Sequence, residues 1–539
     1  MNKLTKLLSL AVAICIVSFS FAACGGKEVA QTTDGKSFSL WTVMDANSSQ
    51  TLSNYNEMLM YQELEKRTGV HIDFIHPIAG STGSEAFMTM LSGSTMPDIV
   101  EYNWNSYTGG PDQAIEDGVI VALNDYLEEY APNFYNYMEG EKGKANDNLY
   151  RLQSMTEKGN YYGFTSLRVG HYRSYAGILV RADKLREWNM SIPETIDDWT
   201  ALFAKAKSEG FDEPFTSGNE IFSFGLPWPS NCFNSGFDVG KDFYVEGDKI
   251  VFAPFQPGYK EFVAQMAEWV KNGYVDTSFV TNDSATLEGK MVNGTSIATY
   301  YTISSMEAMT TSARQIDPNF ELVACPNPVP EKGDALEFHD MSGEVGVPAF
   351  AITNDCGNVT EVIKWCDYIY SEEGAELHAF GIEGDTYTVT EADGEKHYVY
   401  TDKVINYDEN DFSSVAASIF SYALPAGSPG LSDHPDYLNS MYTLDSQKEA
   451  LEMWNKDTAT ARKHLLPTLT YTEEESREKT DILEIAQDTL EVALTNIILG
   501  KASIDTYDDA IKEAKANGYD RLLEINQAAY DRYMSKLDK

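Results

Sequence analysis

The chain has 539 residues, of which 43% are hydrophobic and 12% aromatic, a composition typical of a globular protein rather than a disordered or fibrous one. Lys and Arg total 40 whereas Asp and Glu total 83, so the formal net charge is −43. A chain this acidic repels polyphosphate, which argues against nucleic-acid binding and against a polybasic grip on anionic lipid. The eight His and six Cys exclude a dense metal or disulfide scaffold.

Residues 1–23 are predicted to be the signal peptide of a lipoprotein. Lys3 and Lys6 precede an apolar run at 7–21, which is shorter than the ~20 residues that a membrane-spanning helix needs. Small residues stand directly before Cys24, a pattern that resembles the bacterial lipobox, in which the cysteine is lipid-modified after cleavage. The alternative is an ordinary signal peptide that happens to have a cysteine nearby.

Residues 24–36 are polar and lack aromatics, so we expect a lipidated Cys24 followed by a flexible tether. Nothing later in the sequence approaches 18 consecutive apolar residues. The predicted location is therefore extracytoplasmic, with a soluble body held by lipid at the outer face of the cell membrane.

The cysteines beyond Cys24 leave two alternatives open. Cys232, Cys325, Cys356 and Cys366 could pair in an exported chain, or they could be buried free thiols.

The first hundred residues of the body predict alternating strands and helices. Residues 37–43 alternate in polarity and carry aromatics, as a strand does. Residues 53–68 have helical spacing and are followed by a glycine, a frequent helix terminator. Residues 70–75 and 97–102 predict two more strands, with a short helix at 84–91 between them. This order predicts a parallel sheet with crossover helices, in which ligands bind beyond the carboxyl ends of the strands.

Several short motifs together resemble one family. Residues 65–74 (EKRTGVHIDF) and 92–100 (SGSTMPDIV) resemble the first lobe of the family 1 extracellular solute-binding proteins of ABC importers. Further similar stretches follow in the family's order, at 162–164, 179–185, 192–199, 289–290, 371–374, 381–387, 497–501 and 527–533. The last two resemble a long-chain subgroup of Gram-positive lipoproteins, whose better-understood members bind complex oligosaccharides.

The resemblance implies an α/β fold with two lobes, of the periplasmic-binding-protein type, joined by hinge strands and followed by a helical C-terminal region. It implies a first lobe of residues 37–165 with 343–385, and a second lobe of residues 166–342 with 386–539. The ligand would lie in the cleft between them. Residues 481–499 are amphipathic and predict a long helix packed on the second lobe.

Motifs for catalysis or metal binding are not found in the sequence. It contains no H-E-x-x-H, C-x-x-C, G-x-S-x-G or phosphate-loop pattern. His71 and His76 would point to opposite faces of a strand, and residues 205–215 are too short for the calcium loop of some relatives. We therefore predict no catalytic residue, no metal and no cofactor. A surface glycoside hydrolase remains a remote alternative, since paired carboxylates cannot be read from sequence.

Aromatic side chains are the informative residue class, because rings cover the apolar face of a sugar while polar neighbours bind its hydroxyls. Helical spacing predicts core positions for Trp188, Trp199, Trp269, Trp365 and Trp454. The predicted ligand contacts follow strands, lie on the lobe crossing or stand in loops: Trp41, Asp45, Trp104, Asn105, Tyr107, Tyr172, Arg173, Trp228, Tyr301, Glu383, Asp385 and Tyr387. The alternatives are edge packing for the tryptophans, a surface salt bridge for Arg173, and a structural turn for 383–387.

The predicted function is reversible capture of an oligosaccharide by a monomeric, lipid-anchored protein that delivers it to an ABC permease. The alternative is the same fold binding peptide or another small solute.

Overall fold

The computed structural model describes residues 36–78, 83–218, 232–339, 341–392, 394–407, 412–456 and 458–537. The chain divides into two units at Ser37, and the fold below is that of the second, Phe38–Lys539. The predicted signal peptide, Cys24, nearly all of the tether and Trp228 lie outside the described residues.

A six-stranded sheet in the order β14-β4-β11-β3-β1-β2 forms the centre of the first lobe. Its strands are β1 (Ser37–Trp41), β2 (His71–Ile75), β3 (Ile99–Tyr102), β4 (Phe164–Arg168), β11 (Val345–Ile352) and β14 (Gly430–Ser432). β1 is parallel to β3, β14 is parallel to β4, and β11 is antiparallel to both β3 and β4. The carboxyl ends of β1, β3, β4 and β14 therefore lie at the same edge of the sheet.

The three strands and two helices predicted near the N-terminus of the body are confirmed. The predicted helix at 53–68 is a 3-10 turn followed by α2 (Leu59–Thr68), which ends at Gly69 with a φ of 69°. The predicted short helix is α3 (Gly83–Leu91). Leu40 and Ile99 are fully buried, because helices cover the sheet that these strands form.

The remaining elements of the first lobe are mainly short helices: α4 (Gly110–Glu116), α5 (Leu127–Tyr130), α6 (Pro132–Met138), α7 (Glu141–Ala145), α8 (Leu149–Ser154), α14 (Val359–Tyr368), α15 (Glu372–Phe380), α16 (Asp402–Ile405), α17 (Val415–Tyr422) and α18 (Pro435–Met441). A hairpin of β12 (Tyr387–Ala392) and β13 (Glu395–Tyr400) stands between α15 and α16.

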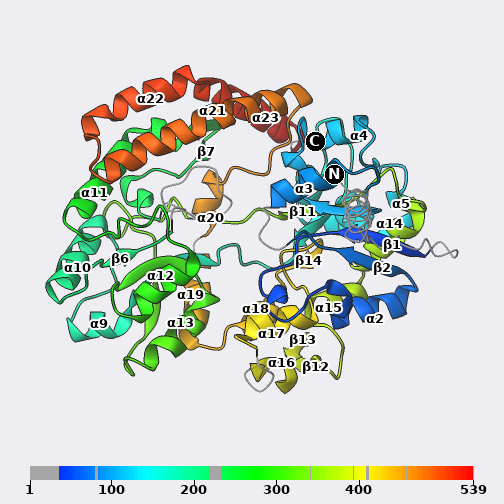
Figure 1. Ribbon diagram of the computed structural model, residues 1–539, viewed down its shortest axis with the longest axis horizontal. Helices are drawn as coiled ribbons and strands as arrows, with labels where there is room; N and C mark the ends of the chain where they lie inside the picture. Colours follow the sequence, from blue (N-terminus) through cyan, green and yellow to red (C-terminus); the bar gives the residue numbers. More distant parts are fainter. Residues whose placement is uncertain are drawn as a thin grey trace, which may run out of the picture. The chain divides into compact units, whose positions relative to one another are not determined.

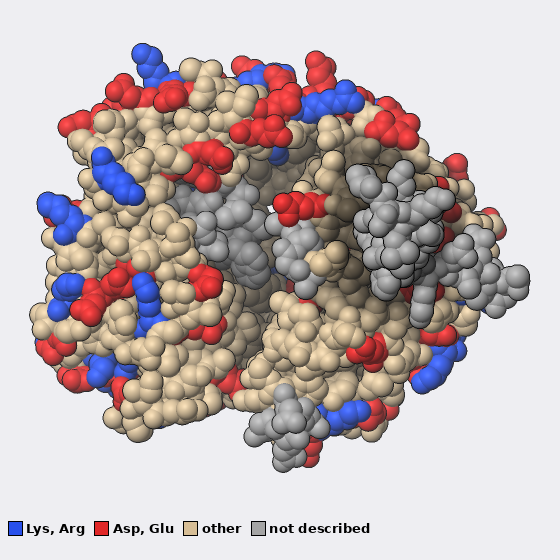
Figure 2. Space-filling model, in the orientation of Figure 1, with Lys and Arg blue, Asp and Glu red and all other residues tan. Residues whose placement is uncertain are grey.

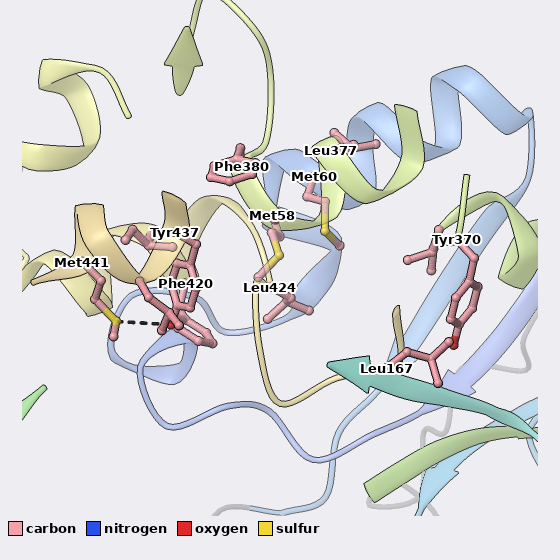
Figure 3. Close-up of a cluster of buried hydrophobic side chains, with 14 of the residues drawn as sticks. Met58, Met60, Leu167, Tyr370, Leu377, Phe380, Phe420, Leu424, Tyr437 and Met441 are labelled. Atoms are coloured by element: carbon pink, nitrogen blue, oxygen red, sulfur yellow. Dashed lines mark hydrogen bonds between the residues drawn. The ribbon is translucent and has the colours of Figure 1, made fainter. Parts of the chain in front are cut away.

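The first lobe extends well beyond residue 385, where the sequence analysis ended it. β14 pairs with β4 in the register Gly430 to Ser166, which places it in the first sheet. Figure 3 shows the core that results, in which Met58 and Met60 at the start of α2 share one cluster with Phe420 of α17 and Tyr437 of α18. The hydroxyl of Tyr437 donates to the Met441 sulfur at 3.2 Å. No local sequence pattern predicts that the chain returns to the first sheet at β14, because the return depends on strand pairing across some 260 residues of chain.

A four-stranded sheet in the order β10-β5-β9-β6 forms the centre of the second lobe. Its strands are β5 (Ala176–Arg181), β6 (Phe215–Thr216), β9 (Ala298–Thr302) and β10 (Leu322–Cys325). β6 is parallel to β9, and β5 is antiparallel to both β9 and β10. The helices that pack around it are α9 (Ala182–Glu187), α10 (Ile196–Ser208), α11 (Pro257–Lys271), α12 (Ser284–Val292), α13 (Ser305–Arg314) and α19 (Asp445–Asn455), with a hairpin of β7 (Phe243–Glu246) and β8 (Lys249–Phe252).

The predicted core tryptophans are buried as expected. Trp199 and Trp269 are fully buried, and Trp365 and Trp454 are 2% exposed. Trp188 is partly buried and packs edge-on against Phe211 with ring centroids 6.0 Å apart. Thr195 and Asp198 form a reciprocal capping box at the start of α10, which fixes where that helix begins.

Three helices end the chain: α21 (Glu473–Ile498), α22 (Tyr507–Ala516) and α23 (Tyr519–Leu537), coloured orange to red in Figure 1. α21 is longer than the predicted helix at 481–499, and it begins with its own capping box between Thr472 and Glu475. Leu490, Leu494 and Ile497 are buried in the same core as α10 and α11, which confirms the predicted packing on the second lobe. A short helix, α20 (Thr458–Ala461), precedes this region.

The surface is rich in carboxylates, as the composition predicts. Carboxylates outnumber basic groups on the face shown in Figure 2, including over α21 and α22.

Cys232, Cys325, Cys356 and Cys366 are free thiols. Burial raises the pKa of the Cys356 thiol to about 12, which makes it unreactive as a nucleophile at neutral pH. In the part of the chain that the structure describes, no helix has the length and apolarity to cross a bilayer.

The contact between Gly177 of β5 and Trp454 of α19 makes a testable prediction. A Cβ added to Gly177 would overlap the Trp454 indole, whose Nε1 donates to the Cys325 carbonyl at 2.8 Å. We expect Gly177→Ala to lower the free energy of unfolding by about 1–3 kcal/mol through overpacking, as measured by urea denaturation.

Gly289→Ala is the matched control, because a Cβ there meets no atom within 4 Å and the residue lies inside α12. It should stabilise the protein slightly or leave it unchanged. Equal stabilities for the two variants would contradict the packing described at Gly177.

Candidate functional site

The chain crosses between the two sheets three times, and these crossings position the site. Residues 169–175 lead from β4 to β5, residues 326–344 lead from β10 back to β11, and residues 442–444 lead from α18 to α19, which packs on β10. Because β10 is parallel to β9, the first two crossings connect the carboxyl edge of one sheet with the carboxyl edge of the other. Both edges therefore face the hinge, where open α/β sheets bind ligands.

A cluster of ion pairs, in which Arg173 and Glu344 are buried, joins the first two crossings. The Arg173 guanidinium lies 2.6 Å from Glu344, and both side chains are less than a tenth exposed. Arg462, from the segment after α20, lies 3.0 Å from the second oxygen of Glu344. Arg168 at the end of β4 pairs with Asp433 after β14 at 3.1 Å. Arg173, for which a sugar contact or a surface salt bridge was considered, thus forms a buried salt bridge.

Trp41, the last residue of β1, lies near Trp104 and Tyr107, which follow β3. Trp41 is 4% and Trp104 1% exposed, and both pack against Phe87 of α3, with ring centroids 6.2 Å and 5.5 Å away. Tyr107 is half-buried, packs on Trp104 and donates its hydroxyl to Asp117 at 2.9 Å. In this structure the two indoles are core residues of the sheet edge.

Asp45 and Asn105 belong to the same edge of the first sheet. The Asp45 carboxylate accepts hydrogen bonds from the backbone N–H groups of Asn47 and Ser48, which makes it the start of a turn. Asn105 is exposed. The structure therefore keeps Asn105 accessible while it uses Asp45 to shape the loop.

The other predicted contacts lie in separate places. Tyr172, on the first crossing, is buried and donates to Glu452 at 2.6 Å. Tyr301 on β9 is half-buried and donates to Glu288 at 3.0 Å.

The predicted loop at 383–387 leads into the hairpin of β12 and β13. Tyr387 is buried at the start of β12, and Glu383 is exposed and forms a β-bridge with it. Asp385 is exposed and pairs with Lys403 at 2.7 Å. The loop thus has the structural role that the sequence analysis considered as the alternative, with Glu383 still open to solvent.

A buried carboxyl group lies beside the loop that follows β1. Glu101 of β3 accepts a hydrogen bond from the Thr42 hydroxyl at 2.5 Å, and burial raises the Glu101 pKa to about 7. The Thr42 carbonyl is in turn 2.9 Å from Nδ1 of His76, whose pKa burial lowers. These bonds fix the backbone between Trp41 and Asp45.

The second lobe contains a cavity of about 260 Å³ at the carboxyl end of its sheet. Its walls come from the segment that precedes and includes β7, from β9, from the second crossing and from the segment after α20: Cys232, Asn234, Gly240, Lys241, Asp242, Phe243, Tyr244, Tyr300, Asn327, Phe338, His339, Met341, Ala461, His464, Leu465 and Leu466. Apart from Tyr300, which the sequence pairs with the predicted contact Tyr301, sequence reasoning did not select these residues as ligand contacts. The only signal was the density of aromatic and amide side chains at 232–244 (CFNSGFDVGKDFY) and at 337–341 (EFHDM).

Two amide side chains in this wall have unsatisfied acceptors. Asn234 is 2% and Asn327 5% exposed. Nδ2 of Asn234 donates to the Val239 carbonyl at 2.5 Å, and Nδ2 of Asn327 donates to the Phe338 carbonyl at 3.4 Å. The Oδ1 atom of each has no hydrogen-bond partner among the described residues.

Aromatic rings form the apolar part of the cavity wall. Phe338 packs edge-on against Tyr244 at 5.2 Å and lies 4.6 Å from the His464 ring. His464 is held in place by the Val245 carbonyl at 2.9 Å and Glu337 at 3.1 Å. The cavity thus combines apolar ring surface with polar side chains, as a small-molecule binding site does. Within the described ranges, no group of three or more His, Cys, Asp or Glu side chains is arranged to hold a metal ion.

The family model for bacterial extracellular solute-binding proteins matches residues 47–376, and the chain belongs to that family. A fructooligosaccharide ABC transporter substrate-binding protein, FusA of Streptococcus pneumoniae, is 26% identical over 292 residues, which cover 49% of this chain and 51% of FusA. The chain thus spans about half the length of this curated relative. Lipoprotein LipO of Bacillus subtilis is 20% identical over 95% of this chain and 96% of its own.

Among solved structures, the alginate-binding protein AlgQ2 without calcium ion has the same fold. It aligns with a TM-score of 0.73 over 93% of this chain and 99% of its own, at 18% identity. The two-lobe α/β fold expected from the sequence is therefore confirmed.

The raised pKa of Glu101 predicts how stability depends on pH. Glutamate ordinarily titrates near 4.5, so between pH 4.5 and about 7 the unfolded chain loses its proton while the folded protein keeps it. The contribution of Glu101 to stability is therefore full below pH 4.5 and is lost as the pH rises toward about 7. The loss amounts to about 3 kcal/mol, since each pKa unit corresponds to about 1.4 kcal/mol.

The glutamine side chain does not titrate, so Glu101→Gln does not lose stability in this way as the pH rises. We expect the stability of the variant relative to wild type to rise by about 2–3 kcal/mol between about pH 5 and about pH 8 in urea denaturation. The exposed Glu391→Gln is the matched control and should show no such trend. A relative stability of Glu101→Gln that is the same at both pH values would rule out a raised pKa.

Proposed function

We propose that this protein captures an oligosaccharide in the cleft between its two lobes and delivers it to an ABC permease, without chemically changing it. The observation that carries the proposal is the cavity at the carboxyl end of the second sheet, where aromatic rings stand beside polar side chains. Sugars present apolar C–H faces and hydroxyl donors, which match these two kinds of group. The printed functions of FusA and AlgQ2 support the same ligand class.

The first-lobe side of the site is proposed from the residues beyond β1 and β3. Trp41 and Trp104 belong to the buried cluster against which Tyr107 packs, and Asn105 directly follows Trp104 in the chain. We propose that the indoles hold Tyr107 and Asn105 at the ligand-facing edge. Tyr301 and Glu383 remain proposed contacts because both keep part of their surface accessible. Ligand that touches both lobes would stabilise a closed state through contacts that are better in that state, with the crossings as the hinge.

A binding experiment tests the proposal directly. Residues 25–539 would be screened by thermal shift and calorimetry against fructooligosaccharides, other oligosaccharides and a peptide mixture. Ligand at 100 times its Kd should stabilise the protein by about 2.7 kcal/mol. Binding of peptides alone would favour the second candidate function, a peptide receptor, and turnover of a bound sugar would favour an enzyme.

Phe338→Ala tests whether the cavity is the binding site. Loss of this ring should weaken sugar binding by about 10-fold or more, because an aromatic wall supplies much of the contact area. Val399→Ala, at an exposed position of the β12–β13 hairpin, is the control and should bind as wild type does. Equal affinities of both variants would place the ligand elsewhere.

We further propose that Cys24 carries a lipid that holds the protein at the outer face of the membrane. The similarity to lipoprotein LipO supports this. We expect Cys24→Ala to release the protein into the medium and to abolish metabolic labelling with palmitate. A variant that stays bound to the membrane would exclude Cys24 as the anchor.

A further inference from the structure

A row of exposed aliphatic side chains crosses the carboxyl edge of the first sheet. Among the described residues, five large apolar side chains at this edge are between 38% and 86% exposed: Val43, Ile75, Ile78, Val169 and Val347. The other exposed large apolar side chains lie on helices, on the β12–β13 hairpin or in loops of the second lobe. Exposed apolar side chains that are scattered singly need no explanation, whereas a group of them at one place marks a binding surface.

Val43 and the two isoleucines stand at the ends of β1 and β2. The backbone N–H of Thr42 donates to the Ile75 carbonyl at 3.1 Å, so the ends of these two strands lie side by side. Ile75 is the last residue of β2, Ile78 lies three residues beyond it, and Val43 lies two residues beyond the end of β1. Val43 also lies beside the first residue of α3, because a Cβ added to Gly83 would stand 3.9 Å from it.

Val347 and Val169 continue the row on the other side of β3. Ala349 of β11 pairs with Tyr102, the last residue of β3. Because β11 is antiparallel to β3, Val347, two residues before Ala349, lies past the end of β3. Val169 directly follows β4, and its backbone N–H donates to the Ser432 carbonyl of β14 at 3.1 Å, which keeps it at the same edge.

The row is long enough for a chain of several sugar residues. It extends over five neighbouring strands, from β2 through β1, β3 and β11 to β4. Adjacent strands are ~4.8 Å apart, so the row spans ~19 Å, which is several times the width of one sugar ring. The cavity of the second lobe, with a volume of about 260 Å³, is smaller than the ~300–1,000 Å³ of pockets that enclose a drug-sized ligand. A larger ligand must therefore also lie on surface outside that cavity.

Aliphatic side chains at strand ends suit a sugar chain better than a peptide. The C–H faces of sugar rings are apolar, and the hydrophobic effect favours covering them with aliphatic surface. Asn105, which follows β3 between Val43 and Val347, is exposed and can bond to the hydroxyls at the rim of a ring. An extended peptide binds along the side of an edge strand, where backbone groups are free to pair, whereas this row runs across the ends of the strands.

We propose that this aliphatic row is a platform on the first lobe, on which several consecutive residues of an extended oligosaccharide lie with their C–H faces against the protein. The inference rests on the proposed function, and it names the size of ligand that the same site accepts. Long chains cover the whole row, whereas a disaccharide covers only part of it.

Length series of oligosaccharides test the inference on the wild-type protein. Each series has a single linkage and runs from the disaccharide to the hexasaccharide, with fructooligosaccharides, manno-oligosaccharides and oligogalacturonides as the probes. Affinities are measured by calorimetry at pH 7 in physiological salt. In a series that binds, we expect the affinity to rise by about 10-fold or more between the disaccharide and the pentasaccharide, because each added residue covers more of the row.

Substitutions in the row then test its residues. The double variant Val43→Ser with Ile78→Ser should weaken binding of the pentasaccharide by about 10-fold or more and leave the disaccharide less affected. The matched control is Val399→Ser with Ile316→Ser, which makes the same two changes at exposed positions elsewhere and should leave affinity unchanged. Val169→Ser tests the other end of the row independently. Circular dichroism and urea denaturation identify any variant that fails to fold, and the remaining variant then decides the question.

Each outcome separates this inference from the proposed function. Pentasaccharide binding that the folded row variants retain in full would overturn the inference and leave oligosaccharide capture standing. An affinity that does not rise with chain length, or a control variant that weakens binding as much as the row variants do, would overturn it as well. Failure of every series to bind the folded wild-type protein would overturn the proposed function and the inference with it.

Discussion

The arrangement of the two lobes depends on one carboxylate, that of Glu344. Glu344 lies at the end of the second crossing. Its carboxylate is 2.6 Å from the guanidinium of Arg173, which belongs to the first crossing, and 3.0 Å from that of Arg462, which belongs to the segment after α20. An unpaired carboxylate in such a buried place would be strongly destabilising, because breaking a buried pair costs about 3–5 kcal/mol. Stretches of chain that are far apart in sequence are therefore held at one point, and the carboxyl edges of both sheets face it.

This ion-pair cluster also shapes the chemistry of the candidate site. The guanidinium groups of Arg168, Arg173 and Arg462 are all bound to Asp433 or Glu344, so they act as structural groups of the hinge. The cavity of the second lobe is lined by amide and aromatic side chains together with Lys241 and Asp242. The strongly negative net charge of the chain is a property of its solvated surface and does not describe the cavity.

The C-terminal helices connect the lobes a second time. α21 packs in the core of the second lobe, whereas Arg532 of α23 binds Glu157, which follows α8 of the first lobe, at 3.0 Å. Arg532 also binds Glu475 at the start of α21 at 2.5 Å, so the contact is shared by both helices. Any motion of one lobe against the other must therefore be transmitted through these helices as well as through the crossings.

The sequence by itself determined the features that depend on neighbours along the chain. The first strands and helices and the buried Trp199 and Trp269 follow from spacing within one element, and the structure has them where they were predicted. The order of short motifs indicated the family, which the family match confirms.

Tertiary structure alone decided the rest, because it depends on contacts between distant residues. Pairing of Gly430 with Ser166 returns the chain to the first sheet, and packing of Phe87 of α3 buries Trp41 and Trp104 although both follow strands as predicted. Asn234 and Asn327 are separated by about ninety residues, and nothing near either one marks it as a binding residue. They line the same cavity because the fold of the second lobe brings the 3-10 turn that begins at Asn234 next to the segment that follows β10.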